Sequence, residues 1–215
     1  MATQVLDAPV VPVFTETHID ITCFGADNGS ITLAQTQNGV NPLTFTISPV
    51  AGTFNASSNT FENLPPNTYS ITATGTNSCT STIIDIEISE PDEILNVSAS
   101  VVEFGCSAGN NDNNATVTVN GGITGGSGNY VIYEFIDSAS NVVQSGASNV
   151  LTVTDRTGES YTINVYDDNG CSGSTTATVL PFDEMTGASA AVTTTETCAP
   201  GSEGEITVTA TSTSG

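Results

Sequence analysis

The sequence has almost no positive charge and no tryptophan. Its 215 residues contain one Lys or Arg and one His against 23 Asp and Glu, which gives a formal net charge of −22. Binding to nucleic acid requires cationic side chains that displace counterions from the phosphates, and an anionic membrane surface attracts cationic side chains for the same reason. We therefore expect neither nucleic acid nor an anionic membrane as a partner.

Long apolar runs are also missing from the sequence. No segment approaches the roughly 18 consecutive apolar residues that a membrane-spanning helix needs, and the first residues have neither the basic region nor the apolar region of a signal peptide. We therefore predict no membrane insertion by this chain. We expect a signal peptide and any anchor to lie elsewhere, in a longer protein of which this chain is a fragment.

Side chains that perform catalysis are scarce. His18 and Arg156 have no partner in a recognisable acid–base or nucleophilic motif, and no pair of carboxylates lies in a distinctive glycosidase motif. A zinc site would require several Cys or His ligands at short spacing, but there is no Cys-x-x-Cys. These absences predict a non-catalytic protein with no cofactor, apart from the calcium discussed below.

Three segments of the chain repeat one another. Each complete segment has a first cysteine, a Tyr and a second cysteine ten residues after the Tyr: Cys23, Tyr69 and Cys79, then Cys106, Tyr161 and Cys171. Cys198 begins a third segment, and the first cysteines are 83 and 92 residues apart. This period suits a small β-sandwich. We predict a tail at 1–10, repeat 1 at 11–91, repeat 2 at 92–182 and a truncated repeat 3 at 183–215.

Apolar residues alternate with polar ones, as expected for strands with one buried face. The segment Tyr130 to Ile136 is almost continuously apolar and predicts a central strand. With turn signals between the segments, this predicts about seven strands per repeat and an all-β fold of tandem immunoglobulin-like β-sandwich repeats in an elongated array. The expected core positions include Ile31 and Leu33, then Leu43, Phe45 and Ile47, then Ile84, Ile86 and Ile88.

The five cysteines fit two complete repeats and one truncated repeat. We expect two disulfide bonds, Cys23 with Cys79 and Cys106 with Cys171, because each repeat then closes its own loop. This pairing has one difficulty. In simple immunoglobulin strand order the first and last turns of a repeat lie at opposite ends of the sandwich, so either the strand count is wrong by one or the cysteines remain thiols.

Acidic residues and tyrosines mark two further positions in each repeat. Tyr69 and Tyr161 each follow a turn at the start of a strand, as in a tyrosine corner, whose hydroxyl binds upstream backbone. Carboxylates where repeats meet offer oxygen ligands for a calcium ion, although they also suit a solvated linker. The candidate calcium ligands are Glu90, Asp92, Glu93, Asp183 and Glu184.

The motifs of the first repeat resemble those of a known repeat family. Residues 23–31 (CFGADNGSI), 61–69 (FENLPPNTY), 77–79 (NSC) and 89–91 (SEP) are similar to the SprB-type repeat of giant gliding and adhesion proteins of Bacteroidetes. Repeat 2 departs from the pattern at residues 110–114 and 155–159. The resemblance implies export to the cell surface of a Gram-negative bacterium and display on an outer-membrane-associated filament that grips a substratum. It transfers no ligand-binding residue.

Two functions follow as hypotheses. The first is a structural and adhesive segment of a secreted surface filament, whose partners are neighbouring repeats of the same polypeptide and an extracellular surface. The alternative is a module that binds carbohydrate or another surface, with junctions stiffened by calcium. It requires exposed aromatic side chains, for which the candidates are Tyr133, Tyr166 and Phe104.

Overall fold

The part of the chain that the structure describes contains β-strands and no helix. The computed structural model describes residues 9–36, 41–107, 111–195, 198 and 203–212, so most of the predicted tail lies outside it. The strand pairings in these ranges are antiparallel, and the predicted all-β class is confirmed. No helix long and apolar enough to cross a membrane occurs among the described residues.

The described residues of the first module form seven strands in two sheets. The sheet orders are β1-β2-β5-β4 and β3-β6-β7. The two sheets share one core, to which Ile31, Phe61 and Tyr69 contribute, because alternate side chains of each strand point to the same face. The strands are β1 (Phe14–Ile19), β2 (Gly29–Gln35), β3 (Thr44–Ser48), β4 (Thr53–Asn55), β5 (Thr60–Leu64), β6 (Asn67–Thr74) and β7 (Thr80–Ile88).

A β-bulge in β7 turns one predicted core residue towards solvent. We expected Ile84 on the core side together with the isoleucines that follow it at two-residue spacing, but Ile84 is 64% exposed. Tyr69 of β6 pairs with Ile86 and Ile71 pairs with Ile83, so β7 has one more residue than β6 in this stretch. The extra residue reverses the alternation, and Ile83 packs against the core instead.

The second module has two main sheets and an additional hairpin. The sheet orders are β14-β11-β8 and β13-β12-β15-β16, and the hairpin pairs β10 with β9. The predicted central strand at Tyr130–Ile136 is confirmed, because β12 has a neighbour on each side. The strands are β8 (Ala99–Val102), β9 (Gly105–Ser107), β10 (Asn111–Asn113), β11 (Ala115–Val119), β12 (Tyr130–Ile136), β13 (Val142–Gly146), β14 (Val150–Val153), β15 (Glu159–Asp167) and β16 (Ser172–Val179).

The strand that follows the third core strand joins a different sheet in each module. β4 pairs with β5, whereas β13 pairs with β12. In the first module Pro49 follows β3 and has no N–H for a ladder. The chain then crosses over through Gly52, where a Cβ would lie 2.3 Å from the Glu62 carbonyl oxygen. In the second module the Asp137 carboxylate accepts the Asn141 N–H at 2.8 Å and closes a tight turn beside β12.

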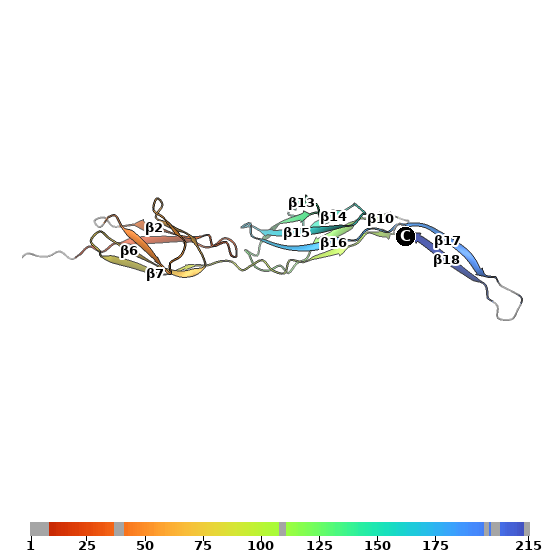
Figure 1. Ribbon diagram of the computed structural model, residues 1–215, viewed down its shortest axis with the longest axis horizontal. Helices are drawn as coiled ribbons and strands as arrows, with labels where there is room; N and C mark the ends of the chain where they lie inside the picture. The colour runs from red at the N-terminus through yellow and green to blue at the C-terminus, as the bar shows by residue number, and fades with distance from the viewer. Residues whose placement is uncertain (1–8, 37–40, 108–110, 196–197, 199–202, 213–215) are drawn as a thin grey trace, which may run out of the picture.

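A single hairpin follows the second module. It pairs β17 (Met185–Thr194) with β18 (Glu205–Ser212), and its apolar side chains are 62% to 73% exposed at Met185, Val192, Ile206 and Val208. Figure 1 shows the two modules end to end along the long axis, with the hairpin beyond the second module. The ends at which the modules meet are therefore the places where sequence motifs of different repeats come together.

Candidate functional site

A disulfide bond joins the two modules. Cys23, between β1 and β2, is bonded to Cys171, between β15 and β16, with the two Cα atoms 5.4 Å apart and a sequence separation of 148. The predicted pairs, Cys23 with Cys79 and Cys106 with Cys171, are therefore wrong. Cys79 is a free thiol, and the side chain of Cys106 lies outside the part of the structure that is described.

The two cysteines of the first module lie at opposite ends of it. The Cys23 loop is next to the end of β7, because the Ile21 N–H donates to the Ser89 carbonyl oxygen at 2.9 Å. Cys79 directly precedes the start of β7, whose 9 residues span roughly 30 Å. A disulfide needs Cα atoms within roughly 7 Å. The difficulty seen in the sequence was therefore real, but its solution is a partner in the next module.

The Cys23 loop is anchored to the chain that leaves the first module. The Asp20 carboxylate accepts the Ser89 N–H at 2.8 Å, and the Glu90 carboxylate accepts the Gly25 N–H at 2.9 Å. The bond from the Ser89 N–H lowers the pKa of Asp20 below its ordinary value, so this carboxylate is ionised at neutral pH. These contacts hold Cys23 at the end of the first module that faces the second.

The Cys171 loop is organised by one buried carboxylate. Asp167 is 2% exposed. Its Oδ1 accepts the N–H groups of Cys171 at 2.8 Å and Asn169 at 3.0 Å, and its Oδ2 accepts the N–H of Ser127 at 2.8 Å. Hydrogen bonds to an ionised acceptor are roughly twice as strong as neutral ones. Asp167 therefore fixes both the backbone around Cys171 and the neighbouring loop.

The linker between the modules packs against the second module. Ile94 is 8% exposed, and a Cβ on Gly173 would lie 2.6 Å from its Cγ2 atom, so the glycine makes room for the linker. Leu95 exchanges two backbone hydrogen bonds with Thr124, at 2.8 and 3.1 Å. The linker is therefore a packed part of the second module and not a free hinge.

The junction thus has two covalent connections, the linker and the disulfide. A cavity of about 280 Å³ lies between them and is lined from both modules by Cys23, Phe24, Asp92, Glu93, Gly170 and Ser172. Bending or rotation about one connection is opposed by the other, because both join the same two bodies at separate points. The geometry therefore restricts the orientation of one module relative to the next.

The acidic residues predicted to bind calcium have other roles or are exposed. Glu90 accepts a backbone N–H in the Cys23 loop, and Glu184 forms an ion pair with Arg156. Within the described residues, no group of three or more His, Cys, Asp or Glu side chains could hold a metal ion. Calcium binding stays a prediction without geometric support. The other three candidates, Asp92, Glu93 and Asp183, are exposed.

The far end of the second module repeats part of the same arrangement. The Glu103 carboxylate accepts the Leu180 N–H at 2.9 Å, as Asp20 does for the first module. Arg156 lies 5.4 Å from the centre of the Phe182 ring, a distance typical of a cation–π contact. Sequence reasoning assigned no role to these residues. The available signal was that Asp20 and Glu103 each lie three residues before a first cysteine.

The aromatic residues named as ligand candidates contribute to packing. Tyr133 and Phe104 pack against the core of the second module, and the Tyr166 hydroxyl donates a hydrogen bond to a neighbouring carboxylate. The Tyr69 hydroxyl donates to the Pro65 carbonyl oxygen at 2.9 Å, which confirms the predicted bond to upstream backbone for Tyr69. The same bond, predicted for Tyr161, is not found among the described residues. Tyr133 also lines a small cavity of about 140 Å³, together with Tyr130 and Asn149.

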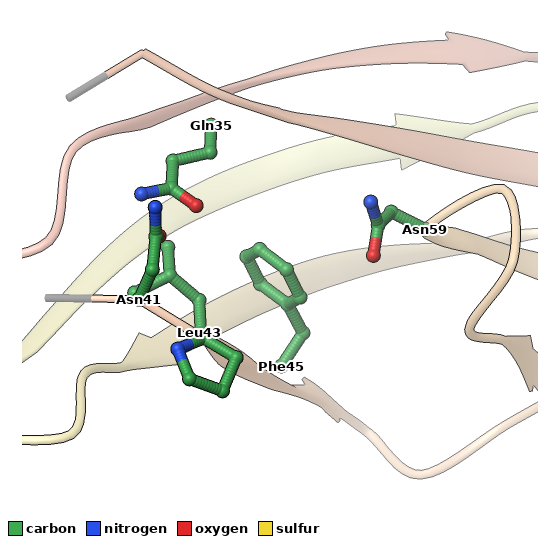
Figure 2. A pocket seen from close by; sticks show the side chains of 6 residues that line it. Gln35, Asn41, Leu43, Phe45 and Asn59 are labelled. Atoms are coloured by element: carbon green, nitrogen blue, oxygen red, sulfur yellow. The ribbon is translucent and has the colours of Figure 1, made fainter. Parts of the chain in front are cut away.

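A cavity in the first module combines an aromatic ring with amide groups. Its volume is about 450 Å³, within the range of small-molecule sites. Figure 2 shows the Phe45 ring with Asn59 on one side and Gln35 and Asn41 on the other. Sequence reasoning placed Phe45 in the core, whereas its ring is only partly buried and lines this cavity. The lining residues are Gln35, Asn41, Pro42, Leu43, Phe45 and Asn59.

No protein-family model matches this chain, and no curated protein sequence matches it either.

Proposed function

We propose that this chain is a non-catalytic structural segment of a large secreted filament, in which stacked repeats set the reach and stiffness of a bacterial surface adhesin. The observation that carries the proposal is the bond between Cys23 and Cys171. A disulfide within one module would stabilise that module alone, whereas this one couples two modules along the long axis. Such coupling suits a protein whose work is to bear load or keep its length.

The strand order supports repeats of the immunoglobulin type. In that fold, strands A-B-E-D form one sheet and C-F-G the other, and the orders β1-β2-β5-β4 and β3-β6-β7 correspond to these letters. The second module keeps the same pairing of its first, second and fifth core strands but places β13 beside β12. A change of one edge strand leaves the two ends of the module, where stacking occurs, in place.

Location at the surface of a Gram-negative bacterium is the second part of the proposal. Disulfides persist in oxidising, extracellular surroundings, and the part of the chain that the structure describes contains one. A net charge of −22 favours solubility and repulsion between neighbouring chains. The resemblance of residues 23–31 and 61–69 to SprB-type repeats supports an adhesive filament, with neighbouring repeats and an extracellular surface as its partners.

Small-angle X-ray scattering of the full chain tests the stalk. The oxidised chain is expected to scatter as an extended rod. A thiol reductant breaks the disulfide at the junction, so the two modules can change their relative orientation and the maximum dimension of the particle is expected to vary more widely. The Cys79→Ser variant, which keeps the junction disulfide, should match the original chain. Calcium or a chelator should leave the scattering curves of the original chain and of the Cys79→Ser variant unchanged. A compact particle, or a rod indifferent to reductant, contradicts the proposal.

Carbohydrate binding is the second candidate function, and the cavity around Phe45 favours it. Amide groups exchange hydrogen bonds with sugar hydroxyls, and an aromatic ring packs against the apolar face of a sugar. On an oligosaccharide array, we expect saturable binding that Asn41→Ala weakens. Asn67→Ala, an exposed amide at the other end of β6, should have no effect. An array on which the unaltered chain binds nothing contradicts this candidate.

A further inference from the structure

We propose that Cys79 is the receiving cysteine of a second inter-repeat disulfide, and that its partner is the first cysteine of a further repeat docked on the free end of the first module. This inference rests on the proposed function as a stack of repeats. It names the partner that the end of the first module accepts: a loop of the same kind as Thr22–Gly25. The observed bond between Cys23 and Cys171 is the precedent for this second bond.

The loops that carry Cys79 and Cys171 have the same backbone structure. In residues 75–79 and 167–171 the N–H of the first residue donates to the carbonyl oxygen of the fifth, at 2.9 and 3.0 Å, and the N–H of the fourth donates to that of the first, at 2.9 and 3.1 Å. The fourth residues, Ser78 and Gly170, both have positive φ, 63° and 85°. The fifth residue is the cysteine in both loops, so the backbone positions the Cys79 and Cys171 side chains alike.

The second loop shows what occupies this position. Cys171 is bonded to Cys23, and its sulfur also lies 3.1 Å from the Thr22 carbonyl oxygen. The occupant is thus a loop from the end of the preceding repeat. The equivalent position of the first module holds a thiol, and Cys79 is partly exposed. Within the described residues, Cys79 therefore differs from Cys171 in having no neighbouring repeat bonded to it.

In both modules, the segment that leads into the module packs beside the loop that carries the second cysteine. The Asn77 side chain donates to the Val10 carbonyl oxygen at 2.7 Å, and Pro12 is among the most deeply buried residues. The segment that enters the first module thus runs beside the Cys79 loop. In the second module the linker at Ile94 likewise packs against Gly173, two residues beyond Cys171. A preceding repeat would therefore arrive next to Cys79.

The chain carries further first cysteines in the position that supplies the partner. Cys106 and Cys198 stand where Cys23 stands in the repeat pattern. Glu103, three residues before Cys106, bonds the chain leaving the second module as Asp20 does in the first. Each complete repeat thus carries one cysteine at each end, and in the proposed stack the first cysteine of one repeat bonds to the second cysteine of the next.

Formation of the bond is a thiol–disulfide exchange. The two thiols lose two protons and two electrons as the S–S bond forms, and a disulfide such as oxidised glutathione accepts them and becomes two thiols.

Duplication of the first repeat tests the inference. A second copy of residues 9–91 is placed ahead of residue 9 of the full chain, so that the linker register is kept, and the protein is equilibrated with glutathione and alkylated without reduction. We expect a disulfide-linked peptide that joins Cys23 of the added copy to the original Cys79, with nearly complete loss of alkylation there. Cys23→Ser in the added copy should restore alkylation of the original Cys79 and leave the Cys23–Cys171 bond intact.

Full alkylation of the original Cys79, with the Cys23–Cys171 bond formed, overturns the inference. If scattering still shows a lengthened rod, the stalk stands and only the second disulfide fails; if the chain is not lengthened, the stalk itself fails.

The unextended chain provides an independent measurement in case the added copy does not fold. At high concentration in glutathione buffer, Cys79 should link to Cys106 or Cys198 of another copy, and monomers with thiol at Cys79 count against the inference.

Discussion

The Cys23→Ser variant is expected to lower the free energy of unfolding of the oxidised chain by about 2–4 kcal/mol. The bond closes a loop across 148 residues, and when one module unfolds while the other stays folded it still constrains a long stretch of chain. The chain-entropy estimate for loops of this length exceeds 4 kcal/mol, and measured values are commonly smaller. A domain of about 60–100 residues, the size of one module, loses about 4–8 °C of Tm per kcal/mol, so the expected fall is about 8–32 °C.

Reductant provides the internal control for this prediction. It should lower the Tm of the original chain to that of Cys23→Ser and have no further effect on the variant. Cys79→Ser should stay within about 0.5 kcal/mol of the original chain, because its thiol is unbonded. If Cys79→Ser loses as much stability as Cys23→Ser, the bond lies within the first module and the junction described above is wrong.

The Asp167→Asn variant is expected to cost about 2–4 kcal/mol of stability in the second module. The carboxylate is 2% exposed and accepts three backbone N–H groups. An asparagine has one oxygen, so its NH2 group would face the N–H of either Ser127 or the Cys171 loop, and a buried donor would lose its acceptor. The measurement is chemical unfolding followed by circular dichroism.

Asp85→Asn is the matched control for this substitution. Asp85 is exposed and has φ 60°, a conformation that asparagine also tolerates, so the same chemical change should shift stability by less than about 0.5 kcal/mol. Equal effects of the two substitutions would mean that loss of one negative charge, and not the Asp167 hydrogen bonds, is what the experiment measures.

Local pattern was a good guide to the strands and a poor guide to their irregularities. Period-two alternation identified Ile31 and Leu33 as core residues, because successive side chains of a strand point to opposite faces. It failed at Ile84, where the bulge in β7 is set by pairing with β6. The sequence also did not predict that β13 pairs with β12, because the partner of a strand depends on how the preceding turn is closed.

For the candidate sites too, the sequence predicted contacts between residues close along the chain but not those between distant residues. Tyr69 was recognisable because its hydroxyl bonds backbone only four residues away. The ring of Phe45 was assigned to the core by alternation, whereas the cavity beside it is formed by the end of β2, the start of β3 with the residues before it, and Asn59. The packing of Arg156 on Phe182 joins residues 26 positions apart and has no short-range signature.

The sequence by itself determined that the chain is all β and that its cysteines recur at equivalent positions, and it raised a difficulty for the predicted pairing within each repeat. Only the tertiary structure decided which cysteines meet. A disulfide requires its Cα atoms to lie within roughly 7 Å, and the length of β7 separates Cys79 from Cys23, whereas end-to-end packing brings Cys171 to a Cα–Cα distance of 5.4 Å from Cys23.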